Sequence, residues 1–351
     1  MSLNKRFERF LEAYDDFREG LDRGLPYDLD LLRELFGDWR GKLFPTEERE
    51  CPFHRVLVLL PSNVPMVLFQ MAPLLLSYPN VTFTFKLSSG ERELIPRFLG
   101  LWRDSRMEAL LSDRERTRDL VGGYDFLVGF GSSELEPFLR ESGKPYRFFG
   151  PRFSLALLPE PDEDQLRGLF KDVLAFDTQG CLCPRFLFTG DPSKLPLSRL
   201  WEEACRRRPP QKGYDPLLFR YSRAVLLLEG KGDWSCHDGG LFQVERIPSL
   251  FPPRTLFLVS ETDPERILTF LGESVSSVQG IVTPQGESHP LLGKETSASL
   301  FSPPGGAQHP PSGWLFERGV TLENFFTPQQ TGKKERRFPG SEVGEDSGLQ
   351  R

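Results

Sequence analysis

Three apolar segments, each followed by a turn and then a helical pattern, constrain the fold of this chain most strongly. Residues 55–60 form a continuous apolar run, which is typical of a strand buried in a parallel sheet. Residues 81–85 are β-branched and aromatic, and residues 124–130 contain a third apolar run. Strand, turn and helix repeated three times predicts a parallel sheet with crossover helices.

The remaining periodicity extends this α/β pattern along the chain. Apolar residues at three- and four-residue spacings predict N-terminal helices over 5–22 and 28–36, with Asp28 or Asp30 as a cap. Further helices are expected over 66–77, 91–103, 105–120, 198–208 and 263–272, and one that begins after Pro159. Strands are expected over 146–158, 222–229, 255–260 and 278–283. The second half of the chain is therefore predicted to build its own, smaller sheet.

A chain of 351 residues exceeds the usual size of one domain, so two domains are expected. We predict an N-terminal helical layer over 1–45 and a dinucleotide-binding domain over 46–158. A catalytic domain follows over 159–327, and its end can return to the first domain. The polar, small-residue-rich stretch 328–351 is predicted to be a mobile tail.

Composition excludes several classes of protein. The net charge of -6 provides no basic field for nucleic acid. The sequence contains no run of about 18 apolar residues, so no membrane span is predicted. The five cysteines are odd in number and sparse, which does not suit a disulfide scaffold, and no apolar signal region follows Met1. We therefore expect the protein to lie in the reducing cytoplasm, where cysteines stay free. The 30 Phe residues are explained mostly by core packing, and an acyl channel is the alternative.

Cys181 is the candidate nucleophile. It follows Gly180, which lets the backbone approach a substrate closely, and Pro184 three residues later stops regular structure. A helix N-terminus or a cation can lower the pKa of a thiol in such a place, and the thiolate is the nucleophilic form. A buried structural thiol is the alternative, because free cysteine is among the most buried residue types.

Polar residues follow the three predicted strands, where parallel sheets bind ligands. The Asn63 amide can donate to an oxyanion, although asparagine also suits a turn. Lys86 can reach a ribose or phosphate, although lysines at strand ends are mostly solvated. Gly131 and Ser132 offer N–H and hydroxyl groups to a phosphate, or simply cap a helix.

No metal site is predicted. The pairs Cys51/His54, Cys181/Cys183 and Cys236/His237 lack the spacing of a structural zinc site. His309 lies in a proline-rich loop, where a surface or packing role is expected.

Taken in order, these segments resemble the motifs of the aldehyde dehydrogenase superfamily, and more closely those of the long-chain acyl-CoA reductases, the family of the fatty-acid reductase subunit of bacterial bioluminescence. Asp177-Thr-Gln-Gly-Cys-Leu-Cys-Pro184 is similar to that family's Asp-x-x-x-Cys-Ser-Ser-Pro. Residues 149–156 and 306–314 are similar to its Gly-Pro/His-x-x-Ser-Phe-Ala and Gly-x-x-Gln-x-Pro-Pro-x-x-Trp elements. The resemblance covers about 55–326.

The resemblance implies an α/β, aldehyde-dehydrogenase-like fold of two Rossmann-like parallel-sheet domains with a helical N-terminal layer. It implies that the Cys181 thiolate attacks an acyl thioester and that Asn63, with the Cys181 backbone N–H, holds the oxyanion. Lys86 would meet the adenosine ribose and Ser132 the pyrophosphate. A nicotinamide cofactor would then reduce the acyl-enzyme, releasing an aldehyde.

Two positions refine the implied activity. Phe148 aligns with the glutamate that activates water in hydrolysing members, which favours a reductase over a dehydrogenase. Ser89 stands where NAD-preferring members place a glutamate, and Arg92 follows it. A neutral serine tolerates a ribose 2′-phosphate and an arginine can pair with it, so NADPH is the expected cofactor.

The sequence also departs from the family. Leu182 and Cys183 replace Ser-Ser, so Cys183 could compete as the nucleophile. The element 314–319 is one residue longer than the family's Trp-x-x-Asp-Gly, and the chain is shorter after the cysteine, so activity could depend on a partner or be lost. The expected acyl donor is acyl-CoA or an acylated carrier or partner protein. Two forms of assembly stay open, a homo-oligomer and a complex with an acyl-transfer protein. Two alternative functions also stay open, an ordinary aldehyde dehydrogenase and a non-catalytic scaffold of the same fold.

Overall fold

The computed structural model describes residues 2–21, 28–42, 47–61, 64, 66–88, 92–111, 114–211, 214–228, 232–233 and 238–328. The described residues form two compact units, one from residues up to 150 together with 309–328, the other from 151–308. The predicted domain boundaries at 45, 158 and 327 stay predictions. The predicted tail, 328–351, lies outside the described residues apart from Pro328.

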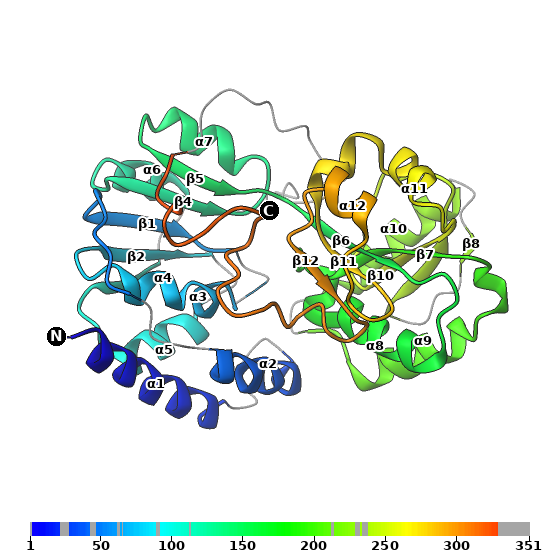
Figure 1. The fold of residues 1–351 in the computed structure, drawn as a ribbon, viewed down its shortest axis with the longest axis horizontal. Coiled ribbons are helices and arrows are strands. Elements are labelled where there is room, and N and C mark those ends of the chain that lie inside the picture. The colour runs from blue at the N-terminus through cyan, green and yellow to red at the C-terminus, as the bar shows by residue number, and fades with distance from the viewer. Residues whose placement is uncertain are drawn as a thin grey trace, which may run out of the picture. The chain divides into compact units, whose positions relative to one another are not determined.

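The first unit is a parallel sheet with helices on both faces (Figure 1). Its helices are α1 (Leu3–Glu19), α2 (Leu29–Lys42), α3 (Val67–Gln70), α4 (Ala72–Ser77), α5 (Leu94–Trp102), α6 (Arg114–Val121) and α7 (Leu135–Glu141). Its strands are β1 (Arg55–Leu59), β2 (Thr82–Leu87), β3 (Met107–Leu111), β4 (Phe126–Phe130) and β5 (Tyr146–Phe149). They run parallel in the order β3-β2-β1-β4-β5, so the sheet is doubly wound and strand order reverses between β1 and β4.

Aromatic packing fills one face of this sheet. Side chains from α1, α2, α3 and α5 form a connected cluster of edge-to-face and stacked rings: Phe10, Tyr14, Phe17, Phe36, Phe69, Phe98 and Trp102. The predicted N-terminal helices are thus present, and Asp28 is the cap of α2, since its carboxylate accepts the N–H groups of Asp30 and Leu31 at 3.0 and 3.1 Å. Aromatic core packing accounts for many of the phenylalanines.

The second unit is also a mostly parallel sheet. Its strands are β6 (Phe153–Leu157), β7 (Pro184–Thr189), β8 (Gly232–Asp233), β9 (Gly240–Gln243), β10 (Thr255–Ser260), β11 (Val278–Val282) and β12 (Leu300–Ser302), in the order β12-β11-β6-β7-β10-β9-β8. Only β8 pairs antiparallel among the strands described. The helices are α8 (Glu163–Leu174), α9 (Leu197–Arg207), α10 (Pro216–Leu228), α11 (Pro264–Leu271) and α12 (Pro290–Glu295), with 3₁₀ turns η1 (Ala175–Thr178), η2 (Pro192–Lys194) and η3 (Gly272–Ser277).

Helices cover both faces of this second sheet. Apolar residues of α8 and α9 pack on one face, and those of α10, α11 and α12 pack on the other. The sheet is therefore buried on both sides, which explains why its strands read as continuous apolar runs. The prediction of an α/β protein with two parallel sheets is confirmed.

Four local predictions were wrong. Residues 222–229 belong largely to helix α10, because its buried positions Phe219, Ser222 and Leu226 follow helical spacing that begins upstream at Pro216. Residues 105–120 contain the largely exposed edge strand β3 before helix α6. The stretch 66–77 is divided between α3 and α4. The stretch 146–158 is two strands, β5 and β6, which belong to different sheets.

The first unit is completed by a returning segment, 309–328. The Arg147 guanidinium donates to three of its carbonyls, those of Phe325, Asn324 and Thr327, at 2.6, 2.7 and 2.9 Å. The Phe326 ring lies edge-on to Tyr78 and Phe126. Because arginine carries several donors in a fixed plane, one buried side chain holds this irregular backbone in place.

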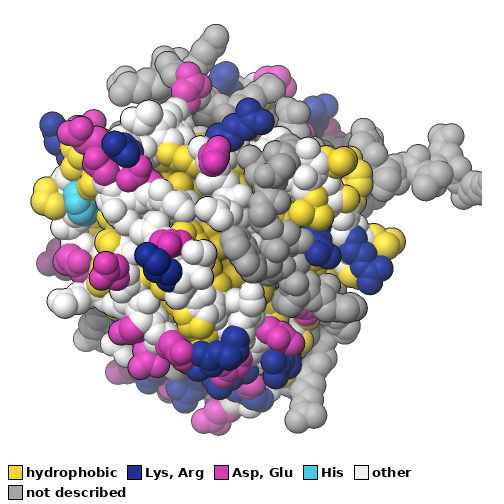
Figure 2. Space-filling model, turned by 90° about the vertical axis from the view of Figure 1, so that its right-hand side faces the viewer, with side chains coloured by type: hydrophobic (Ala, Val, Ile, Leu, Met, Phe, Trp, Pro, Cys, Tyr) yellow, Lys and Arg dark blue, Asp and Glu magenta, His cyan; other side chains and the backbone are white. Residues whose placement is uncertain are grey.

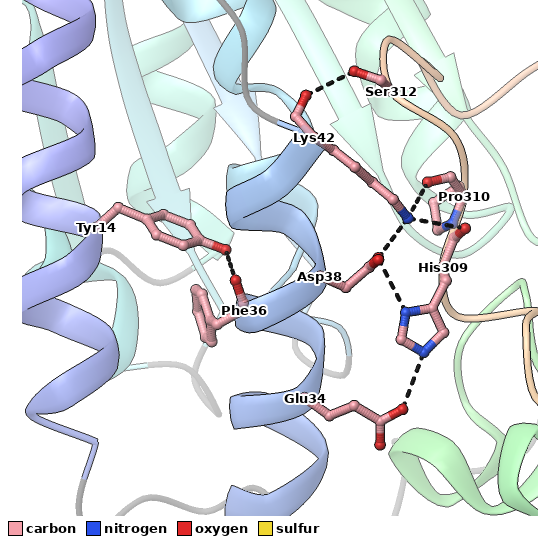
Figure 3. Close-up of polar contacts among 8 residues, drawn as sticks. All are labelled: Tyr14, Glu34, Phe36, Asp38, Lys42, His309, Pro310 and Ser312. Atoms are coloured by element: carbon pink, nitrogen blue, oxygen red, sulfur yellow. Dashed lines mark hydrogen bonds and ion pairs between the residues drawn. The ribbon is translucent and has the colours of Figure 1, made fainter.

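A polar cluster fastens the start of the returning segment to helix α2 (Figure 3). His309 Nε2 lies 3.2 Å from a Glu34 oxygen and its Nδ1 lies 3.0 Å from an Asp38 oxygen. Both ring nitrogens can donate only when the imidazole is protonated. Lys42 pairs with Asp38 and donates to the carbonyls of His309 and Pro310 at 3.2 and 2.9 Å. His309 thus has the packing role that its loop position predicted.

The surface carries both signs of charge. Acidic and basic side chains are interspersed over the face drawn in Figure 2, so no single-signed patch covers that face. Among the described residues, no helix is both long enough and apolar enough to span a bilayer.

The Asp38 cluster leads to a stability prediction. Burial opposes ionisation of Asp38, but hydrogen bonds from Lys42 and His309 outweigh it and hold the pKa of this carboxyl below its usual range. Asp38→Asn should therefore lower the free energy of unfolding by about 1 kcal/mol near neutral pH. The difference should vanish as the pH falls through the folded-state pKa, since the carboxyl is then neutral too.

Urea unfolding at pH 7 and at successive steps below pH 4, followed by tryptophan fluorescence, measures this difference. Asp16→Asn, at an exposed position on α1, is the matched control and should change little. Equal stabilities of wild type and Asp38→Asn at pH 7 would contradict the predicted role of the cluster.

Candidate functional site

Two of the predicted cofactor residues lie at one edge of the first sheet, Lys86 near the end of β2 and Gly131 directly after β4. Lys86 on β2 lies beside Leu59 on β1, and Leu59 lies beside Gly129 on β4. Lys86 and Gly131 are therefore at the same carboxyl edge, next to the reversal of strand order between β1 and β4. Nucleotides bind to doubly wound sheets at such a reversal. Asn63, Ser89 and Gly90 lie outside the described residues.

Helix α7 packs closely on β4 because position 129 has no side chain. A Cβ on Gly129 would lie 2.7 Å from the Leu139 side chain and 3.0 Å from that of Leu135. The Gly131 N–H already donates to the Phe149 carbonyl at 3.3 Å. The side chain of Ser132, the next residue, is exposed and therefore accessible to a ligand.

The end of β2 adds a buried polar atom. Within the described residues, the buried Ser88 hydroxyl has no hydrogen-bonding partner. An unsatisfied hydroxyl in a protein interior calls for a water or a ligand. Lys86, half-buried, precedes it by two residues, and the exposed Arg92 precedes helix α5. This edge thus fits a polar ligand such as a nucleotide.

Cys181 belongs to the second unit and lies at the amino edge of its sheet, whereas Lys86 and Gly131 lie at a carboxyl edge of the first sheet. The Cys181 loop follows α8 and η1 and enters β7 at that strand's amino end. The Cys181 side chain is half-buried. Its carbonyl accepts a hydrogen bond from the buried Ser154 hydroxyl at 2.9 Å. Gly280 makes room for that hydroxyl, since a Cβ there would lie 2.7 Å from the Ser154 oxygen.

The backbone just before the cysteine is strained. Phe176, Asp177 and Thr178 have φ angles of 49°, 52° and 62°, in the left-handed region. None is a glycine, and such a conformation costs an L-residue roughly 1–2 kcal/mol. Strain of this kind clusters at functional sites and persists only where surrounding contacts enforce it.

A buried ion pair enforces this turn. The Asp177 carboxylate accepts from Arg254 Nη1 at 2.9 Å and from the Gln211 N–H at 3.0 Å. Burial raises the pKa of Asp177, and the Arg254 charge, together with these hydrogen bonds, opposes that rise. Arginine remains protonated in proteins, so a guanidinium cation faces the Asp177 carboxyl group.

Cys183 differs sharply from Cys181. It is fully buried, its thiol donates to the Ala175 carbonyl at 3.0 Å, and the Gln308 amide contacts its sulfur at 3.6 Å. Burial raises the pKa of Cys183 to about 12, so the thiol stays protonated at neutral pH. A protonated, enclosed thiol is a poor nucleophile, which leaves Cys181 as the better candidate of the two.

Helix α8 connects the cysteine loop to a second loop, 303–308. The helix begins with a capping box in which Asp162 accepts from the Gln165 N–H at 2.8 Å. Near its other end, the fully buried Asp172 accepts the N–H groups of Gly305 and Ala307 at 2.7 and 3.2 Å. Burial raises the pKa of Asp172 to about 7, against those two hydrogen bonds. Asp172 thereby fixes the loop that carries Gln308 to Cys183.

Sequence reasoning missed the residues that hold the cysteine loop: Ser154, Asp172 and Arg254. The sequence did offer a signal for Ser154, which lies inside the quoted motif segment 149–156. Gln308, the residue that contacts Cys183, likewise lies inside the quoted segment 306–314. Arg254 directly precedes an apolar strand, and nothing in that pattern indicates its partner. Among the described residues, no group of three His, Cys, Asp or Glu side chains could hold a metal ion.

Comparisons with known proteins bear on the fold. No protein-family model and no curated protein sequence matches the chain. The structure is similar to that of an oxidoreductase from Marinobacter aquaeolei, with a TM-score of 0.72 and 10% identity over 93% of this chain and 84% of that one. It is also similar to the NADP-dependent glyceraldehyde-3-phosphate dehydrogenase from Bacillus halodurans complexed with NADP, with a TM-score of 0.64 and 12% identity over 86% of this chain and 78% of that one.

A further similar structure is glyceraldehyde-3-phosphate dehydrogenase GapN from Methanocaldococcus jannaschii complexed with NADP, with a TM-score of 0.64, 12% identity and coverage of 92% and 85%. At identities this low, the likeness establishes the fold. The fold is the α/β, aldehyde-dehydrogenase-like architecture with two parallel-sheet domains that the motif resemblance predicted.

Asp172 gives a pH prediction. Its folded-state pKa of about 7 lies above the unfolded value of about 3.9, so the folded state binds the extra proton between these values. Wild-type stability should therefore fall from pH 4 to pH 7, relative to Asp172→Asn, by on the order of 1.4 kcal/mol per unit of pKa difference.

Chemical unfolding at half-unit pH steps checks this slope. Asp164→Asn, an exposed position on the same helix, should parallel the wild type. Parallel curves for wild type and Asp172→Asn would contradict the assigned protonation of Asp172.

Proposed function

We propose that this protein is a nicotinamide-dependent oxidoreductase that reduces an acyl thioester to an aldehyde, with NADPH as the cofactor. The observation that carries the proposal is the half-buried Cys181, on a strained loop beside the enclosed Cys183, in an aldehyde-dehydrogenase-like fold. The acyl donor would be acyl-CoA or an acylated carrier or partner protein.

The chemistry begins at the Cys181 sulfur. The thiolate attacks the thioester carbonyl, and the donor's thiolate leaves as the acyl group becomes bonded to Cys181. The Cys181 backbone N–H and the Asn63 amide would donate to the oxygen that carries negative charge in this step. Ser154 supports the geometry by holding the Cys181 carbonyl.

A nicotinamide cofactor held at the first sheet would supply a hydride to the acyl carbon, whose bond to the Cys181 sulfur would then break and release the aldehyde and the Cys181 thiolate. Lys86 would bind the adenosine ribose and Ser132 the pyrophosphate, with Gly131 allowing close approach of the backbone. The Ser88 hydroxyl, which has no hydrogen-bonding partner among the described residues, and the reversal of strand order at this edge support such a ligand. The bound NADP of the similar glyceraldehyde-3-phosphate dehydrogenases is consistent with this assignment.

Phe148 supports reduction over hydrolysis. It is a buried aromatic side chain of β5, at the position that the motif alignment equates with the water-activating glutamate. A phenyl ring cannot accept a proton from water. The acyl-enzyme would therefore persist until a hydride is delivered.

Two alternatives make distinct predictions. An ordinary aldehyde dehydrogenase is favoured by the similarity to NADP-dependent glyceraldehyde-3-phosphate dehydrogenase, and would oxidise an aldehyde without a thiol acceptor. A non-catalytic scaffold of the same fold would bind no dinucleotide, which calorimetry measures.

Covalent trapping is the direct test of the proposal. Acyl-CoAs of different chain length, added without cofactor, should give an acyl adduct visible by intact-protein mass spectrometry. Cys181→Ala should abolish the adduct, and Cys183→Ala, the matched control, should retain it. NADPH should then discharge the adduct as aldehyde. Adducts lost in Cys183→Ala but retained in Cys181→Ala would overturn the assigned nucleophile.

Cofactor preference tests Ser89 and Arg92. NADPH should give a higher kcat/KM than NADH, because Ser89 does not repel the 2′-phosphate and Arg92 can pair with it. Arg92→Ala should lower kcat/KM for NADPH roughly tenfold, equivalent to about 1.4 kcal/mol, and leave that for NADH nearly unchanged. Arg118→Ala, an exposed arginine on α6, is the control. A higher kcat/KM with NADH in the wild type would refute this interpretation.

A further inference from the structure

Arg254 makes more contacts around the cysteine loop than the ion pair alone. Its side chain is wholly buried, and its own φ of 54° is left-handed. Its backbone N–H donates to the Asp177 carbonyl at 3.0 Å, in addition to the side-chain pair. Its Nε donates to the Asp238 carbonyl at 2.9 Å and its Nη2 to the Arg208 carbonyl at 2.6 Å.

These bonds join segments that are far apart in sequence. Arg254 directly precedes β10, Asp238 precedes β9, and Arg208 follows α9. Asp177 precedes Cys181 by four residues. The Asp238 and Arg208 carbonyls thus fix the guanidinium, which in turn holds Asp177 through its carboxylate, while the Arg254 N–H holds the Asp177 carbonyl. The strained turn is therefore held by Arg254 rather than by its own local preference, which opposes the observed angles.

The adjacent Thr178 gives independent evidence that this conformation is imposed. It is fully buried at a positive φ, which is a genuine outlier for a β-branched residue. Its hydroxyl has no hydrogen-bonding partner within the described residues. The Thr178 hydroxyl therefore adds no hydrogen bond to the turn within the described residues, whereas Asp177 and Arg254 do.

We propose that Arg254 is the positioning residue for Cys181. By holding Asp177, it fixes the left-handed turn 176–178 and so sets the place and the electrostatic surroundings of the thiol. The inference rests on the proposed role of Cys181 as nucleophile.

The pair also sets the sign of an electrostatic effect. Removing the Arg254 cation takes one positive charge away from both the Asp177 carboxylate, at 2.9 Å, and the Asp238 carboxylate, at 4.0 Å. The loss of the cation and the remaining negative charge disfavour a thiolate on the loop that the pair holds, where Cys181 follows Asp177 by four residues. Neutralising Asp177 instead removes a negative charge and favours it.

The test measures alkylation of Cys181 by iodoacetamide as a function of pH, with the modified cysteine identified by peptide mass spectrometry. This readout needs neither acyl-CoA nor cofactor. Arg254→Met should raise the midpoint pH of alkylation by at least half a unit. Asp177→Asn should lower it, and Arg254→Lys, which keeps the charge, should lie between wild type and Arg254→Met.

Arg147→Met is the matched control. Arg147 is also buried and also holds three backbone carbonyls, but in the first unit. It should lower thermal stability without moving the alkylation midpoint. A midpoint unchanged in folded Arg254→Met, or moved equally by Arg147→Met, would overturn the proposal.

Thr178→Gly provides a second variant that should fold, because glycine adopts a positive φ without strain. It should retain cooperative unfolding and dinucleotide affinity. The single-turnover rate of Cys181 acylation at saturating acyl-CoA should stay within about twofold of the wild type, since glycine keeps the left-handed turn and with it the place of the thiol. A loss of rate of about tenfold would show that the Thr178 side chain, rather than Arg254, fixes the turn.

Failure of the proposed function gives a different result. If wild-type Cys181 is alkylated but is acylated neither by acyl-CoA nor by an acylated carrier protein, the assigned reaction is wrong. The order of alkylation midpoints among the Arg254 and Asp177 variants still decides whether Arg254 controls the thiol.

Discussion

The buried ion pair between Asp177 and Arg254 is the interaction on which the cysteine loop depends. Two charges withdrawn from water are tolerated only when their remaining donors and acceptors are also bonded. Here the Gln211 N–H completes the carboxylate, and the Asp238 and Arg208 carbonyls complete the guanidinium. Removing either partner would leave a buried, unpaired charge, so the pair commits the surrounding loops to a single arrangement.

The candidate residues of the two sheets lie at different edges. In the first unit, Lys86 and Gly131 lie at the carboxyl ends of parallel strands, and Gly129 lets helix α7 pack closely on β4. In the second unit, Cys181 precedes the amino end of β7 and needs hydrogen bonds from neighbouring segments to be placed. A carboxyl edge is organised by the fold itself, whereas this cysteine loop requires dedicated buried contacts.

The sequence predicted most strands of the sheets because burial on both faces leaves a continuous apolar run, as in 55–60 and 255–260. It failed at β3, an exposed edge strand without such a run, and at α10, where a short apolar stretch is compatible with both helix and strand. The candidate cysteine could be located from Gly180 and Pro184. Arg254 could not be linked to Asp177, since 77 residues separate them and only the folded chain brings them together.

The division of the chain also determines the order in which it can fold during synthesis. The second unit is continuous over 151–308, whereas the first lacks residues 309–328 until the ribosome has passed through the whole of the second. In that interval Arg147 has none of its three carbonyl partners, and the aromatic surface around Tyr78 and Phe126 is without Phe326. The apolar surface that Phe326 covers therefore stays open until the returning segment 309–328 has been made, and the first unit is the last part of the described chain that can be completed.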